Sequence, residues 1–147
     1  MKPKSSLVSS DSFIDLAEQH VNSVINLLLS ENIEFSVITK PKYMEMRPHL
    51  DSLFKKPDEY IKFDLIGYSF ETSNIIDNKF MFRAGFGQGK NITESEVSIN
   101  LSNIFQITTT ENGDKPILMN FSEPLEKRNI DRSKMFLSKN RETLSKT

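Results

Sequence analysis

The spacing of apolar residues changes from a helical period to a strand period near residue 30. Over residues 13–30, apolar residues recur at steps of three and four, the period of one helix face: Ile14, Ala17, Val21, Val24, Ile25, Leu28 and Leu29. Beyond this segment they alternate with polar residues in short runs, as in half-buried strands. We therefore expect a mainly β protein with one N-terminal helix, capped by Ser12.

About six short strands are expected after the helix. They cover residues 35–39, 61–65, 80–86, 97–101, 104–108 and 116–121. The Asn112-Gly113 pair between the last two is a strong hairpin signal. Residues 41–58 and 67–78 are expected to be loops, with a helical turn within 49–54. Short strands joined by tight turns favour a small antiparallel barrel or sandwich.

Charge divides the chain into two parts. Residues 1–121, the expected folded domain, hold 12 basic against 16 acidic side chains, a net charge of −4. Residues 122–147 hold seven basic against four acidic side chains, a net charge of +3, and the strand period stops there. We expect this segment to be a flexible basic tail. A nucleic-acid-binding domain normally carries a basic excess, so the domain's charge argues against a nucleic-acid partner.

The composition also limits the kinds of catalytic and metal-binding site that the chain can form. The chain has no cysteine and two histidines, so disulfides and thiolate metal sites are excluded, and neither histidine has a partner at ligand spacing. The glycine-rich run over 85–90 fails the spacing of a phosphate-binding loop. We expect neither an enzyme nor a cofactor or metal. No stretch has the roughly 20 apolar residues of a membrane span, and no signal peptide is apparent, so we expect a cytoplasmic protein without membrane contact.

Two expected strand ends combine small and aromatic residues. One strand runs into Gly67 and Tyr68, and another ends in Ala84 and Gly85. Small residues allow a second backbone to come close, and nearby aromatic residues line pockets for side chains. Both features suit the addition of an extended peptide as a strand. The alternative is that the phenylalanines over 80–86 are only core residues. The predicted peptide contacts are Phe63, Leu65, Gly67, Tyr68, Arg83, Ala84 and Gly85.

The tail contains one run of three apolar residues, Met135-Phe136-Leu137, set between basic residues. Apolar groups gain nothing from exposure to water, so this run either packs on its own domain or docks on a partner. The sequence leaves both alternatives open. The candidate docking residues are Lys134, Met135, Phe136, Leu137 and Lys139.

Residues 21–121 resemble SspB, the adaptor family that delivers substrates to the ClpXP protease. The resemblance rests on the order of several short motifs over about two-thirds of the chain. The motifs are Leu28-Leu29-x-Glu31-Asn32, Pro48-x-Leu50-x-x-Leu53-Phe54-Lys55-Lys56-Pro57-Asp58-Glu59, Phe82-x-Ala84-x-Phe86-Gly87, Val97-x-Ile99-x-Leu101-x-x-Ile104-x-x-Ile107 and Glu111-Asn112-Gly113, closing at Phe121. The Pro-Asp-Glu segment is most similar to the α-proteobacterial branch.

The resemblance implies an Sm-like or SH3-like barrel or sandwich after the helix. Family members are homodimers, often through that helix, which implies dimer contacts from Val21, Val24 and Leu28. Each subunit binds the ssrA tag of stalled nascent chains in an apolar groove. A C-terminal tail docks on the N-terminal domain of ClpX, here through residues 133–139.

One position departs from the family pattern. The basic residue expected just before the second Phe is Gly85, with Arg83 two residues earlier on the same strand face. Two other functions remain open: an Sm-like RNA-binding protein, disfavoured by the acidic domain, and a structural interaction domain without a peptide role. RNA affinity that falls steeply with salt would indicate the first.

Overall fold

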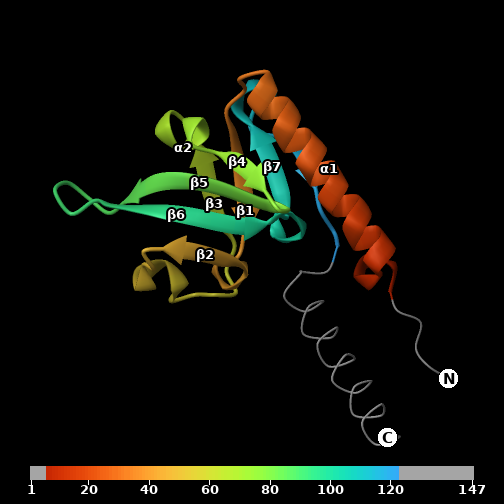
Figure 1. Ribbon diagram of the computed structural model, residues 1–147, viewed down its shortest axis with the longest axis horizontal. Helices are drawn as coiled ribbons and strands as arrows, with labels where there is room; N and C mark the ends of the chain where they lie inside the picture. The colour runs from red at the N-terminus through yellow and green to blue at the C-terminus, as the bar shows by residue number, and fades with distance from the viewer. Residues whose placement is uncertain (1–5, 123–147) are drawn as a thin grey trace, which may run out of the picture.

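Two four-stranded antiparallel sheets and one long helix form the part of the chain that the computed structural model describes, residues 6–122 (Figure 1). The first sheet contains, in spatial order, β3 (Ile61–Leu65), β1 (Phe35–Thr39), β7 (Gln106–Thr109) and β8 (Pro116–Met119). The second contains β2 (Met44–Arg47), β6 (Thr93–Asn100), β5 (Lys79–Phe86) and β4 (Asn74–Ile76). This confirms the mainly β fold with one N-terminal helix, as an open pair of sheets and not a closed barrel.

The long helix α1 (Asp11–Ser30) begins two residues earlier than predicted because Ser10 caps it. The Ser10 Oγ accepts a hydrogen bond from the Phe13 amide at 3.2 Å, and Ser10 has the extended backbone of a cap. Ser12 lies inside the helix, so the prediction that it caps α1 is wrong. Both serines precede the apolar stripe, and the sequence pattern does not distinguish them.

The end of α1 turns the chain directly into β1. Asn32 adopts a left-handed conformation with φ 57°. The Ile33 amide donates to the Leu28 carbonyl at 2.9 Å and the Asn32 amide to the Leu29 carbonyl at 3.2 Å, the paired bonds of a Schellman motif. The predicted end of the helix, residue 30, is confirmed.

The apolar stripe of α1 packs on the protein's own core. Val21 and Leu28, two of the three predicted dimer contacts, are buried there. Val24, the third, is half-buried at the edge of the core. The large apolar side chains that α1 leaves exposed are Leu16 and Leu27, at 63% and 58% of their accessible area. Any dimer contact through the helix therefore has to use its outer face.

A chain of aromatic contacts joins the two sheets. Phe35 of β1 lies 5.8 Å from Phe80 of β5, and Phe63 of β3 lies 5.3 Å from Phe82 of β5, measured between ring centroids. Phe80 and Phe82 are themselves 5.6 Å apart. All four side chains are buried, so the interpretation of Phe80 and Phe82 as core residues is confirmed.

Several short elements lie in segments that were expected to be loops. β2 lies within residues 41–58; α2 (Tyr68–Glu71) and β4 lie within 67–78. The two methionines of β2 are buried and pair with β6, Met44 opposite Ile99 and Met46 opposite Val97. Methionine is not among the residues enriched in strands. The alternation of Met44 and Met46 with polar residues was therefore not recognised as a strand. The described residues therefore form eight strands where about six were expected.

Single turns of 3-10 helix connect the remaining elements. The expected helical turn near residues 49–54 is confirmed, and so is the hairpin of β7 and β8, in which Gly113 is left-handed with φ 66°. The 3-10 turns are η1 (Leu7–Ser9), η2 (Pro41–Tyr43), η3 (Asp51–Phe54), η4 (Leu101–Asn103) and η5 (Thr110–Asn112).

The cap assignment predicts different effects for the two serines. Ser10→Ala should lower the free energy of unfolding by about 1 kcal/mol, because the Phe13 amide loses its acceptor. Ser12→Ala, at an exposed helical position, should change it by less than about 0.5 kcal/mol. Urea denaturation of both variants provides the measurement. A larger loss from Ser12→Ala would contradict the assignment.

Candidate functional site

The far half of β5 is an open strand edge. β4 pairs only with residues 79–81 of β5, while β6 pairs along its whole length. Beyond β4, Thr72 takes the place of a partner strand at Arg83. The Arg83 amide donates to Thr72 Oγ1 at 3.0 Å, and Thr72 Oγ1 donates to the Arg83 carbonyl at 3.3 Å. Ala84 and Gly85 follow with no strand partner on that side within the described residues.

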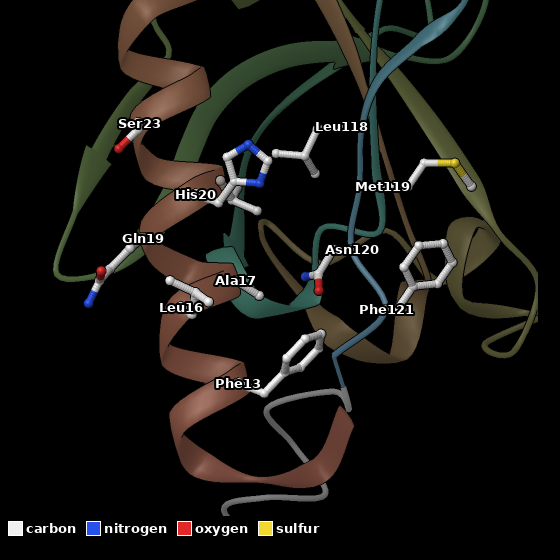
Figure 2. A pocket seen from close by; sticks show the side chains of 11 residues that line it. Phe13, Leu16, Ala17, Gln19, His20, Ser23, Leu118, Met119, Asn120 and Phe121 are labelled. Atoms are coloured by element: carbon white, nitrogen blue, oxygen red, sulfur yellow. The ribbon is translucent and has the colours of Figure 1, made fainter. Parts of the chain in front are cut away.

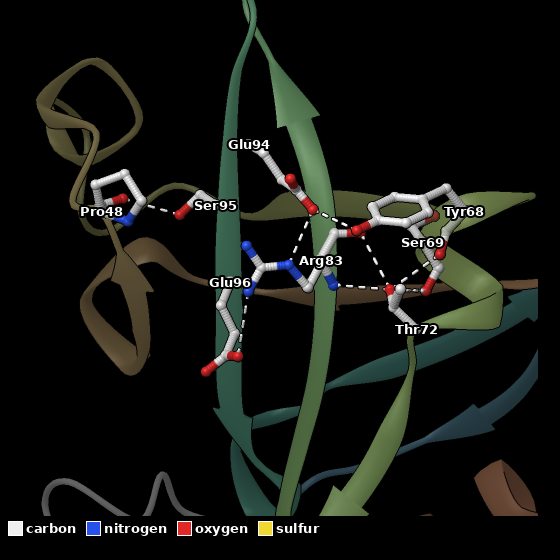
Figure 3. Close-up of polar contacts among 8 residues, drawn as sticks. All are labelled: Pro48, Tyr68, Ser69, Thr72, Arg83, Glu94, Ser95 and Glu96. Atoms are coloured by element: carbon white, nitrogen blue, oxygen red, sulfur yellow. Dashed lines mark hydrogen bonds and ion pairs between the residues drawn. The ribbon is translucent and has the colours of Figure 1, made fainter.

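An exposed polar cluster lies beside this edge (Figure 3). The Tyr68 hydroxyl, from the start of α2, donates to Glu94 of β6. The Arg83 Nε donates to the same Glu94 oxygen at 2.9 Å, and its Nη1 lies 3.6 Å from a Glu96 carboxylate oxygen. We call these four residues the Arg83 cluster. It brings together two of the predicted peptide contacts, Tyr68 and Arg83, from different elements.

Hydrogen bonding within the Arg83 cluster shifts the titration of its members. The bond from Tyr68, and then the bond from Arg83, hold the pKa of Glu94 below its ordinary value of 4.5. The same bond to Glu94 raises the pKa of the Tyr68 hydroxyl. Both shifts favour the forms that these groups already have at neutral pH, an ionised Glu94 and a protonated Tyr68. The hydrogen bond from its Nε holds the guanidinium of Arg83 beside Glu94.

Three other predicted contact residues face inward. Phe63 and Leu65 are buried, and Ala84 packs against the same core on the face of β5 that carries Phe80 and Phe82. Their side chains line the interior and are turned away from any ligand on the surface. We accordingly expect Ala84→Gln to lower the melting temperature, because the longer side chain has to enter the core.

Contact with a neighbouring residue explains why position 85 is a glycine and carries no side chain. A Cβ built at Gly85 would lie 2.9 Å from Cγ2 of Ile92, which returns from the turn between β5 and β6. A basic side chain at this position would displace Ile92. Arg83, two residues earlier on the same face, instead supplies the cation of this strand end.

Gly67 lies at the entrance of a second, polar hollow. It adopts φ 56°, and its amide donates to Glu34 Oε2 at 2.7 Å. The hollow has a volume of about 530 Å³ and is lined by Asn32, Ile33, Glu34, Gly67, Phe70, Glu71, Thr110 and Glu111. Its three carboxylates make it a poor site for an apolar side chain.

No sequence signal predicted the apolar hollow that lies between α1 and β8 (Figure 2). We call it the α1/β8 groove. It has a volume of about 490 Å³ and is lined by Phe13, Leu16, Ala17, Gln19, His20, Val21, Ser23, Leu118, Met119, Asn120 and Phe121. Its two walls are about 100 residues apart in the chain, so no local pattern could have revealed it.

The comparisons with known proteins leave the family open. The chain matches no protein-family model, and a search of curated proteins returns no match. Within residues 6–122, no helix is both long and apolar enough to cross a membrane, and no group of three potential ligand side chains is placed to hold a metal ion. The candidate docking residues of the tail, residues 134–139, lie outside the described part of the chain.

The hydrogen bond from Tyr68 predicts a measurable shift at Glu94. Tyr68→Phe should raise the pKa of Glu94 toward 4.5, whereas Tyr60→Phe, at another exposed tyrosine, should leave it unchanged. A carboxyl NMR titration measures both. Because the folded pKa of Glu94 is lowered, its stabilising effect is present above pH 4.5 and is lost as the pH falls through the folded value. An unchanged Glu94 titration in Tyr68→Phe would contradict this.

Proposed function

We propose that this protein is a non-enzymatic adaptor that binds ssrA-type degradation tags and tethers tagged substrates to the ClpXP protease. The proposal joins the resemblance to SspB with one structural observation, the open edge of β5 at Ala84 and Gly85 beside the Arg83 cluster. An adaptor needs a peptide-binding surface and no reactive group. Its effect comes from raising the local concentration of substrate at the protease.

The open edge supports binding by strand addition. An extended peptide lying along β5 beyond Thr72 would exchange main-chain hydrogen bonds with the unpaired groups there, which supply affinity with little dependence on sequence. Side chains of such a peptide point alternately to the two faces of the sheet. One set meets the apolar edge of the core, where the Phe86 and Phe63 ring centroids are 6.2 Å apart, and the other set meets the Arg83 cluster.

The Arg83 cluster would orient the tag. The guanidinium has five N–H donors, which is more than its contacts with Glu94, Glu96 and Tyr68 use. The remaining donors are available to polar groups of a peptide. Because Tyr68 and Glu94 already hold the side chain, binding costs little further ordering of Arg83.

The test of tag binding compares two cations on one strand. Arg83→Gln should weaken binding of a labelled ssrA-type peptide by more than about tenfold, which corresponds to 1.4 kcal/mol. Lys79→Gln removes the same charge from the same face at the other end of β5 and should leave affinity unchanged. Fluorescence anisotropy titration of full-length proteins measures both. No binding by the wild type, or equal loss in both variants, would contradict the proposal.

We also propose that the adaptor is a homodimer through the outer face of α1. Leu27 and the half-buried Val24 are three positions apart and so lie side by side on the helix. Two copies of this apolar pair suit a self-complementary contact around a twofold axis.

Leu27→Glu should give a monomer that keeps its fold, since Leu27 is exposed in the single chain. Leu28→Glu is unsuitable for this test because Leu28 is buried, and a charge there would unfold the chain. Sedimentation velocity at micromolar concentration measures the oligomeric state. A monomeric wild type would overturn the dimer.

A further inference from the structure

The α1/β8 groove leaves large apolar side chains in contact with water. Leu16 on α1 is 63% exposed, and Met119 and Phe121 on the other wall are 55% and 68% exposed. Figure 2 shows Phe13, Ala17 and His20 of α1 turned toward the segment that carries Leu118 and Asn120. The volume of the groove falls in the range of roughly 300–1,000 Å³ typical of ligand pockets. Such a surface is suited to a small apolar segment.

The described part of the chain ends beside this groove, at Ser122. Asn120 is buried, and its Nδ2 donates to the carbonyls of Ser102 and Ile104 at 3.1 and 3.0 Å. Its Oδ1 accepts from the amide of Ser122 at 2.8 Å. These bonds fix residues 120–122 against the fold, so the following residues start from a defined point adjacent to Phe121, a lining residue.

The length of the tail allows its apolar run to reach the whole groove. Twelve residues separate Ser122 from Met135, and such a segment spans up to roughly 40 Å when extended. The 20 residues of α1 span about 30 Å. A tether of this length holds the linked segment at an effective concentration on the order of millimolar.

Charge also favours the tail as occupant. Over its whole length α1 contains no lysine or arginine, and its acidic residues, Asp11, Asp15 and Glu18, lie in the same turns as Phe13 and Leu16. The tail has the opposite charge. Basic residues precede and follow its apolar run: Arg132, Lys134, Lys139 and Arg141. Attraction of this kind orients the segment along the helix.

We propose that Met135-Phe136-Leu137 docks in the α1/β8 groove of its own chain. Docking covers Leu16 and Phe121 and places the basic residues beside the acidic turns of α1. It also holds the segment back from other partners until one of them competes successfully for it. This inference does not depend on tag binding or on ClpX, since it concerns only the chain itself.

The chain contains no tryptophan, so Phe136→Trp introduces a single fluorescent reporter into the full-length protein. In the folded protein its emission maximum should lie at shorter wavelength than in the same protein unfolded by urea. Adding Leu16→Glu should move the emission to the unfolded position. Adding Ile76→Glu, at an exposed apolar side chain of β4 outside the groove, should leave it unchanged. Circular dichroism checks that both variants remain folded.

A second measurement uses the natural Phe136. Trypsin should cleave the tail after Lys134 and Lys139 faster in Leu16→Glu than in the wild type or in Ile76→Glu. Emission of the introduced tryptophan at the unfolded position in the Phe136→Trp protein would overturn the proposal, and so would a shift that survives Leu16→Glu. A shift that disappears on dilution, together with a change in sedimentation, would assign the groove to a second copy and would equally overturn it. Neither tag nor ClpX is present, so these outcomes leave tag binding to its own test.

Discussion

The contact between the inward faces of the two sheets is the interaction on which the other features depend. Phe35 and Phe63 from one sheet interlock with Phe80 and Phe82 from the other, and all four rings are removed from water. Burial of each large side chain contributes about 1.5–3 kcal/mol. Because this contact uses the inner face of every central strand, binding is left to the strand edges, the outer faces and the seam along α1.

Each of the two candidate binding surfaces lies at an edge of one sheet. β5 has eight residues and its neighbour β4 has three, so part of β5 is an open edge, and Thr72, just after α2, closes it only as far as Arg83. The other sheet ends at β8, where α1 packs beside it and leaves the α1/β8 groove. The two surfaces lie on different sheets. A peptide at the open edge and the tail in the groove therefore need not exclude one another.

The sequence predicted well what depends on local periodicity. The helix, six of the eight described strands and the Asn112-Gly113 hairpin follow from spacing and turn residues. Long-range packing decided the rest. Alternation placed Phe82 and Arg83 on opposite faces of one strand, but it did not show that Phe82 contacts Phe63 while Arg83 meets Glu94. The stripe on α1 likewise could not show that Val21 and Leu28 pack on the protein's own core and not against a second copy.

The central claim is that the domain binds the tag while the tail recruits the protease. The most direct test is degradation of an ssrA-tagged substrate by ClpXP at low substrate concentration, with the full-length protein or with a chain lacking residues 130–147. The account predicts faster degradation with the full-length protein and no stimulation by the shortened chain, although both bind the tag with the same affinity. Full stimulation by the shortened chain, or none by the full-length protein, would contradict it.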